Sequence, residues 1–183
     1  MVENVLKKRI IKISKEAAFI LVTIACAILL PQILHGAGVL LGVGGKLGQM
    51  FLPMYLPVLI IGFYRGYISG TITGLLSPII SFAITEMPTA ALLPYITVEL
   101  VALGVFSGIF AKIKMPAILR VISAVAIAKA IRLLVHAIVL LASSGAIAPS
   151  VLFAGIVTSI PGIIIQLAVV TVFVMIMEKR KNA

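Results

Sequence analysis

The sequence predicts an all-α membrane protein, a single domain built as a bundle of six transmembrane helices. Of its residues, 62% are hydrophobic and 11% are charged, whereas a soluble domain carries about 25% charged residues. The charged residues also stand mostly between long apolar runs. Because so few charges cannot cover a surface that faces water, we expect most of the surface to lie in lipid.

Six apolar runs supply the helices, since a helix that crosses about 30 Å of hydrocarbon needs roughly 20 residues. After a basic arm at 1–15, we expect helices at 17–34, 50–64, 67–84, 89–111, 117–142 and 151–177. The first run resembles a cleaved signal peptide, because Ala25-Cys26-Ala27 looks like a cleavage site. It continues through Leu34, however, so we expect an uncleaved helix.

Basic residues predict the orientation, because cytoplasmic loops carry an excess of lysine and arginine. With six helices, the basic arm, the corner at Arg65, the loop that begins at Lys112 and the basic tail lie on one side. The other side receives Lys46 and Glu86. We therefore expect both termini in the cytoplasm. The net charge of +10 comes from these same basic residues beside the apolar runs, so we attribute it to membrane orientation and do not expect nucleic acid as a partner.

The composition gives no reason to expect catalysis, a metal or a cofactor in this chain. Cys26 is the only cysteine, so a thiolate cluster cannot form, and the two histidines, His35 and His136, stand far apart. The chain has no Asp, no Walker sequence for ATP and no nucleophile beside a base. We expect a binding or transport protein that does not hydrolyse ATP itself.

Ionisable residues inside the apolar runs are the first indication of a site. Lys129, Arg132 and His136 follow one another at spacings of three and four, so they share one helix face. Glu99 lies about halfway along the run 89–111. Charged residues within a membrane usually face a cavity or a partner. We expect Glu99 to pair with Lys129 or with Arg132, and either pairing leaves a cation for an anionic ligand.

Prolines are the second indication, because each removes a backbone hydrogen bond that hydrocarbon cannot replace. They fall in the outer halves of the expected helices or, for the last, near mid-depth: Pro53, Pro57, Pro78, Pro94 and Pro161. Ordinary helix kinks are one explanation, and a cavity that opens to the outside is the other. We expect a ligand site between the first outer loop and the fourth to sixth helices. Its predicted residues are Arg132, His136, Lys129, Glu99, Tyr95, Gly42 and Gly44.

Small residues recur at intervals that let helix backbones approach closely. The glycines of this kind are Gly62, Gly66, Gly70, Gly74, Gly104 and Gly108. On the first helix the small residues are Ala18, Thr23, Ala25 and Ala27. Packing inside the bundle accounts for most of the glycines, whereas the row on the first helix either packs internally or faces a partner.

The stretch from Gln49 to Leu59, QMFLPMYLPVL, continues through spaced glycines to Ser77-Pro78. Together with Met87-Pro88 and Val98-Glu99-Leu100 it resembles the substrate-binding (S) subunits of energy-coupling-factor (ECF) vitamin transporters. The motif-like similarity covers residues 49 to 110, and the length and six expected helices fit along the whole chain. The chain departs from the family at Tyr55, where many related subunits have histidine.

The resemblance implies a subunit of a prokaryotic plasma membrane that captures a vitamin-like micronutrient from outside. It would deliver the ligand to a transmembrane coupling subunit and two cytoplasmic ATPases, which use the ATP. Docking would use the small-residue face of the first helix, here Ala18, Thr23, Ala25 and Ala27, and the loop 36–48 would be a lid. Pantothenate and a cobalamin-like compound are both candidate ligands. Two alternatives remain: a self-sufficient small transporter or channel, and a membrane enzyme that acts on a lipid.

Overall fold

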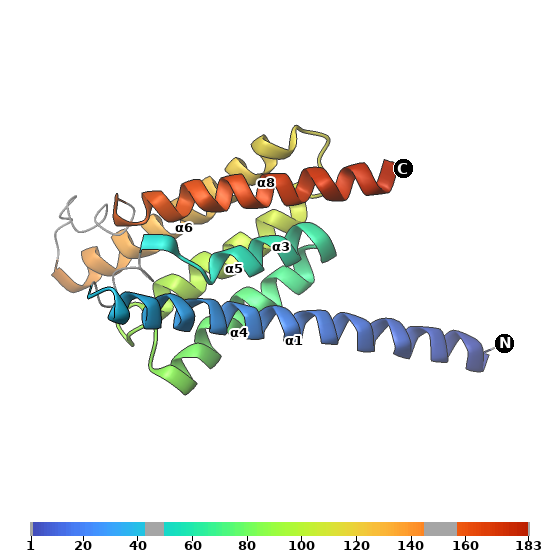
Figure 1. Ribbon diagram of the computed structural model, residues 1–183, viewed down its shortest axis with the longest axis horizontal. Coiled ribbons are helices and arrows are strands. Elements are labelled where there is room, and N and C mark those ends of the chain that lie inside the picture. Colours follow the sequence, from blue (N-terminus) through green and yellow to red (C-terminus); the bar gives the residue numbers. More distant parts are fainter. Residues whose placement is uncertain (1, 43–49, 145–156, 183) are drawn as a thin grey trace.

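The computed structural model describes residues 2–42, 50–144 and 157–182, which form helices and connecting turns without a strand. The helices are α1 (Val2–Leu40), α3 (Tyr55–Arg65), α4 (Tyr67–Thr85), α5 (Leu93–Phe110), α6 (Ala117–Ser144) and α8 (Ile160–Asn182). Figure 1 shows both chain termini at one end of the bundle, which we call the termini end. The opposite end is called the distal end.

Five helices in the described part of the chain are long and apolar enough to cross a membrane: α1, α4, α5, α6 and α8. The prediction of an all-helical chain with several membrane-crossing segments is confirmed to this extent. The sixth, α3, has 11 residues, which at 1.5 Å per residue amounts to about 16 Å. It is therefore too short to span the roughly 30 Å of a bilayer core by itself.

Protein surrounds the short helix α3 on several sides. It packs against α1, α4, α5 and α8, and side chains such as Val58 and Leu59 are fully buried in the core. The prediction of one continuous helix from residue 50 is wrong. Residues 50 and 51 are helical, but Leu52 takes a left-handed φ of 46° and α3 begins only at Tyr55. A residue before proline avoids the right-handed helical region, and Leu52 precedes Pro53. Irregular backbone of this kind is tolerated at membrane depth only where protein or a cavity covers it.

The glycines of α4 and α5 lie where the two helices meet, which confirms that their regular spacing reflects close helix packing. A Cβ added at Gly74 would lie 2.3 Å from the carbonyl oxygen of Leu100, and one at Gly104 would lie 2.2 Å from that of Gly70. No side chain fits at such distances, so these two backbones are in direct contact. Gly66 has another role, because its φ of 97° forms the corner between α3 and α4.

Two expectations at the distal end require correction. The glycine-rich loop does not begin at Gly36, because α1 continues to Leu40 and only then reaches Gly42, whose φ is 72°. The rest of the predicted lid, including Gly44, lies outside the described residues. Pro161 is not at mid-depth, because it is the second residue of α8. A proline is favourable in the first turn of a helix, where its missing N–H costs no hydrogen bond.

Basic residues gather at the termini end. Arg65 lies 3.3 Å from Glu16 of α1, and Arg120 at the start of α6 pairs with Glu178 near the end of α8. Lys112, which follows α5, places its ammonium group 5.5 Å from the ring centroid of Tyr67. The loop cations that are separated in sequence are thus brought to one end of the molecule.

Candidate ligand-binding site

A cavity of about 310 Å³ lies at the distal end of the bundle. Its walls come from the second half of α1, the segment before α3, the connection between α4 and α5, and α6. The lining is mostly apolar. The residues are Pro31, His35, Leu52, Pro53, Met54, Tyr55, Ser81, Met87, Pro88, Thr89, Leu92, Ile96, Arg132 and Thr158.

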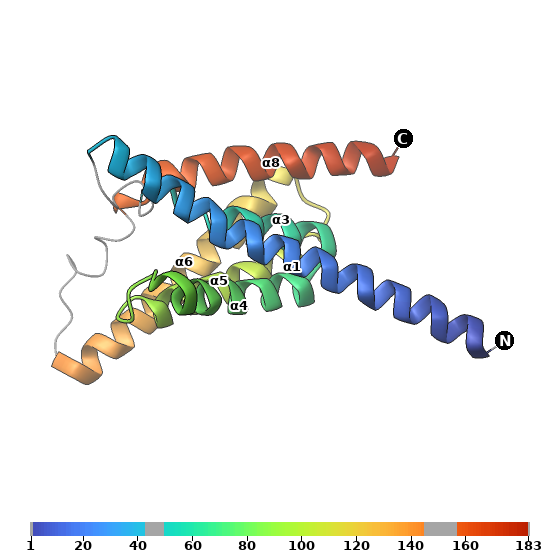
Figure 2. The ribbon, with the colours of Figure 1, turned by 60° about the horizontal axis from the view of Figure 1, so that its bottom comes forward.

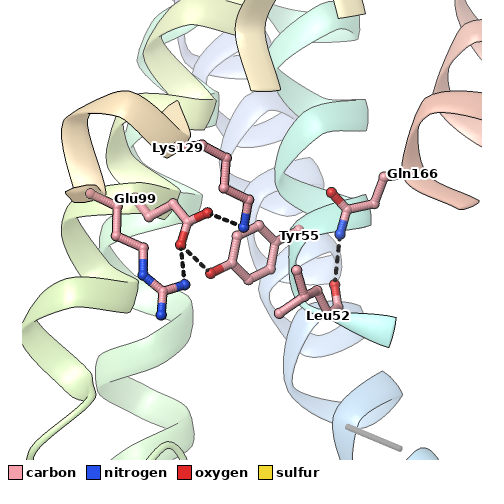
Figure 3. Close-up of polar contacts among 6 residues, drawn as sticks. Leu52, Tyr55, Glu99, Lys129 and Gln166 are labelled. Atoms are coloured by element: carbon pink, nitrogen blue, oxygen red, sulfur yellow. Dashed lines mark hydrogen bonds and ion pairs between the residues drawn. The ribbon is translucent and has the colours of Figure 1, made fainter. Parts of the chain in front are cut away.

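The irregular segment before α3 lines the cavity with Leu52, Pro53 and Met54, and α8 supports this segment. The amide of Gln166 donates to the carbonyl oxygen of Leu52 at 3.4 Å (Figure 3). A Cβ at Gly162 would lie 2.5 Å from the carbonyl oxygen of Met50, so this glycine lets the segment approach α8. The carbonyl oxygen of Leu52, which has no partner within a helix, thus accepts a hydrogen bond from protein. Hydrocarbon could not supply one.

Side chains from α3, α5 and α6 form a cluster around one buried carboxylate (Figure 3). Glu99 of α5 is 1% exposed. The hydroxyl of Tyr55 and the Nη1 of Arg132 each donate to its Oε2 at 2.7 Å, and the ammonium of Lys129 lies 2.5 Å from its Oε1. We call these four residues the Glu99 cluster. Glu99 therefore binds both cations, whereas the sequence left open which of the two it would choose.

The Glu99 cluster holds two cations and one carboxylate, an excess of one positive charge. A buried charge is costly unless it is paired. Arg132 and Tyr55 line the cavity, whereas Glu99 and Lys129 are not among its lining residues. A guanidinium has five N–H donors in a fixed plane, and the cluster contact uses the Nη1 of Arg132. The arrangement presents an oriented guanidinium whose charge is only partly balanced.

The remaining predicted site residues lie elsewhere in the structure. His136 and Tyr95 pack against each other with ring centroids 4.7 Å apart. Neither of these half-buried residues is among the residues that line the cavity, and Gly42 is not among them either. Gly44 lies outside the described residues. Helix spacing placed His136 on the face of Arg132, but one further turn carries it past the cavity.

Sequence reasoning missed five polar lining residues: His35, Tyr55, Ser81, Thr89 and Thr158. His35 follows Pro31 by one helical turn, and this spacing places both on one face of α1. Tyr55 stands within the proline-rich stretch that resembles the transporter family, but it replaces the histidine of many related subunits, so the resemblance implies no role for it. Ser81, Thr89 and Thr158 carried no signal, because hydroxyl residues are common in membrane helices and turns.

The predicted docking row on α1 is divided between two faces. Ala27 is fully buried in the core. Thr23 is half-buried, and its hydroxyl donates to the carbonyl oxygen of Phe19 at 2.7 Å. Ala18 and Ala25 are exposed. Only these two alanines, which are seven residues apart and so on one helix face, remain available to a partner.

A second ion cluster lies at the termini end and joins α1 to α3 and α4. The Oγ of Ser69 donates to Glu16 at 2.6 Å, and Arg65 lies 3.3 Å from the same carboxylate. The guanidinium of Arg65 also covers the ring of Phe19 at 4.1 Å from its centroid. We call Glu16, Arg65 and Ser69 the Glu16 cluster. Its ion pair is partly exposed, with 33% of the Glu16 side chain and 25% of the Arg65 side chain accessible.

The cavity combines one guanidinium, one imidazole and several hydroxyl groups with a mostly apolar wall. Such a combination is typical of small-molecule binding sites, in which a few polar groups orient the ligand. Comparison of the chain with protein-family models, with curated proteins and with solved structures finds no match in any of the three. The cavity and its charges are therefore the basis for assigning a function.

Proposed function

We propose that the protein is the substrate-binding subunit of an ECF-type importer in a prokaryotic plasma membrane, and that it binds a small anionic, vitamin-like compound. The observation that carries this proposal is the guanidinium of Arg132 at the wall of the cavity, within a cluster of excess positive charge. In this proposal the chain has no catalytic residue or cofactor of its own. The partner ATPases use the ATP, and a transmembrane coupling subunit connects them to this chain.

The charge and size of the cavity favour a small acid. A carboxylate accepts two parallel hydrogen bonds from a guanidinium, which is among the strongest neutralising contacts available. Ser81 and Thr89 offer hydroxyl groups to the amides or hydroxyls of a ligand. The volume of about 310 Å³ is near the lower end of the roughly 300–1,000 Å³ of small-molecule pockets. Pantothenate has suitable chemistry, whereas a cobalamin-like compound requires a larger space.

A matched pair of ligands tests this assignment. Pantothenate and its alcohol analogue pantothenol differ in the carboxylate, and both are titrated into purified, monodisperse protein together with a vitamin panel. We expect the acid to bind about 10- to 100-fold more tightly, because a charged hydrogen bond contributes roughly 1.5–3 kcal/mol. If neutral compounds, including a cobalamin, bind more tightly than the acid, the proposal of an anionic ligand is wrong.

The proposal places the termini end in the cytoplasm and the cavity at the outer surface. The loop cations at the termini end, such as Arg65 and Lys112, support this orientation through the excess of basic residues in cytoplasmic loops. In a Cys26→Ala background, an impermeant thiol reagent added to intact cells should label Glu86→Cys and spare Lys114→Cys. The reverse labelling pattern would show that the protein has the opposite orientation in the membrane.

Coupling is proposed to use the exposed face of α1 that carries Ala18 and Ala25. In cells that hold the coupling module, Ala25→Trp should abolish uptake and leave ligand binding unchanged, because Ala25 is exposed and is not among the residues that line the cavity. Val172→Trp is the matched control, since Val172 is 55% exposed on α8. Equal loss from both variants would contradict a specific docking face.

The two alternatives make different predictions for the protein alone. A self-sufficient transporter moves the ligand into vesicles that contain only this chain, and a membrane enzyme releases a chemically changed lipid. A substrate-binding subunit does neither without its partners, but it retains the ligand. Uptake, retention and product formation in the same vesicles therefore separate the three functions.

A further inference from the structure

The basic arm, residues 1–15, forms the start of α1 and extends beyond the rest of the bundle. Figure 1 and Figure 2 both show it projecting past the C-terminal end of α8. Among the described residues, Glu16 is the first along the chain that contacts another helix through a hydrogen bond or an ion pair. Every described side chain of the basic arm is exposed. The arm thus has no partner within the described bundle.

The apolar face that packs α1 on the bundle continues into the basic arm. α1 packs against α3 and α4, and its side chains Ile24 and Ala27 are buried. Toward the N-terminus, at alternating intervals of four and three residues, the same face carries Ile20, Ala17, Ile13, Ile10 and Leu6. We call Leu6, Ile10 and Ile13 the arm stripe. Their exposure is 53%, 66% and 62%.

Lipid tails do not account for the arm stripe. α1 has 39 residues, or about 58 Å at 1.5 Å per residue, whereas the hydrocarbon core is roughly 30 Å thick. Lys7, Arg9, Lys12 and Lys15 all lie on the arm and are exposed, and charges of this kind are costly inside hydrocarbon. The arm therefore stands outside the core. A row of large apolar side chains in water that continues an existing interface is typical of an interaction site.

The geometry of α1 disfavours a membrane surface or a second copy as the occupant. An amphipathic helix that binds a membrane surface lies in its plane, but α1 continues without a break from Val2 to Leu40. The arm is in line with a helix that crosses the membrane, so it leads away from the surface. The arm stripe also faces the side on which the bundle packs. A neighbour in the same membrane approaches from outside the bundle, whereas this face is open to a protein beneath the termini end.

The charges beside the arm stripe indicate the chemistry of such a protein. The repeat of α1 is that of a coiled coil, in which the residues next to the apolar positions select the partner. Beside the arm stripe these residues are Lys7, Arg9 and Ser14, all exposed. The next one, Glu16, already binds Arg65 of the bundle. The free flanks of the arm stripe are thus basic.

We propose that the basic arm is a docking site for an acidic amphipathic helix of a second, cytoplasmic protein. The partner helix packs its apolar side on Leu6, Ile10 and Ile13 and places carboxylates beside Lys7 and Arg9. Continuity with the packed face of α1 and the charge of the flanks carry this proposal. It takes only the cytoplasmic location of the termini end from the proposed function, and it requires neither the ligand nor transport.

A single tryptophan tests the docking site, because the chain has none of its own. The full-length variant Ile13→Trp is placed in nanodiscs of zwitterionic lipid. A synthetic helical peptide of about three heptads, with isoleucine and leucine on its apolar side and glutamate beside them, is then added. We expect the fluorescence to shift to the blue as the indole leaves water. Ile11→Trp is the matched control, because Ile11 is 48% exposed on another face of the arm and should show no shift.

The charge of the flanks is tested by a peptide with the same apolar side and lysine in place of glutamate. It should bind at least about tenfold more weakly, because like charges beside the apolar contact repel. The double change Lys7→Glu and Arg9→Glu should reverse this preference. The arm projects beyond the bundle, so Tm should stay unchanged in all variants.

Three results would overturn the proposal. One is the absence of a shift with the acidic peptide, or equal affinity for the two peptides. Another is a blue shift of Ile13→Trp without peptide in nanodiscs that contain phosphatidylserine, which would make the membrane surface the occupant. The third is a dimer of the unchanged protein that Ile10→Asp dissociates, which would make a second copy the occupant. None of these readouts involves a small acid or uptake, so failure of the proposed function is distinguishable from failure of this proposal.

Discussion

The Glu99 cluster and the Glu16 cluster use the same three kinds of side chain in different surroundings. Each has a glutamate that binds an arginine and accepts a hydrogen bond from a hydroxyl group. The side chain of Glu99 is 1% exposed, whereas that of Glu16 is 33% exposed. Water can replace the partners of Glu16, whereas the carboxylate of Glu99 is shielded from water by its own partners. The two clusters thus differ in burial: one ion pair joins helices at a partly exposed surface, and the other fixes an arginine at the wall of a cavity.

Glu99→Gln gives the largest expected effect. The change leaves Lys129 and Arg132 close together without a carboxylate, and breaking a buried pair costs about 3–5 kcal/mol. The free energy of unfolding of the detergent-solubilised protein measures this loss. Glu16→Gln is the matched control at the other cluster. Equal losses from the two variants would show that burial does not distinguish the clusters.

Arg132→Gln should act on binding rather than on folding. In this variant Lys129 still neutralises Glu99 and Tyr55 still donates a hydrogen bond to it, so we expect the protein to remain monodisperse. The affinity for a small acid should fall about 10- to 100-fold, because one charged hydrogen bond to the ligand is lost. Calorimetric titration measures the affinity, and Arg65→Gln of the Glu16 cluster should leave it unchanged. Unchanged affinity in Arg132→Gln would remove this arginine from the ligand site.

Tyr55→Phe should cause an intermediate loss of stability. It removes one hydrogen bond to a buried carboxylate that keeps both of its cations. We expect a loss of about 1.5 kcal/mol, at the low end for hydrogen bonds to charged groups. Tyr64→Phe is the control, because Tyr64 contacts Phe19 and Arg65 through its ring. A similar loss in both variants would mean that the hydroxyl of Tyr55 contributes nothing specific.

Glu16→Gln should give the smallest effect. A partly exposed ion pair contributes about 0–1 kcal/mol, and salt screens it. The difference in unfolding free energy from the unchanged protein should therefore shrink when the salt concentration is raised. A loss that matches Glu99→Gln and resists salt would show that the Glu16 cluster is protected from water.

The helices were predictable because their signal is local. An apolar run must satisfy its own backbone in lipid, and only a helix does so within one segment. The errors lie where tertiary packing overrides that signal. Residues 52–54 interrupt the helix, and the carbonyl of Leu52 is satisfied there by Gln166 of α8. The loop expected from residue 36 begins later, because glycine in α1 does not end the helix there.

Part of the site was also predictable from spacing. Three residues along a helix bring Lys129 and Arg132 to one face, and a mid-membrane Glu99 requires a cation. Spacing could not show that Glu99 binds both of them, or that Tyr55, 44 residues earlier, would donate to the same carboxylate. It also could not show that Ala27 faces the core and Ala25 does not.

The sequence by itself determined the class of the protein, the positions of most helices and the residue types that a buried site could use. These properties depend on the hydrophobicity of each segment and on backbone hydrogen bonds within it. Only the tertiary structure decided which side chains meet in the Glu99 cluster and which of them border the cavity. The reason is that such contacts depend on the rotation of each helix about its axis, and packing against neighbouring helices sets that rotation.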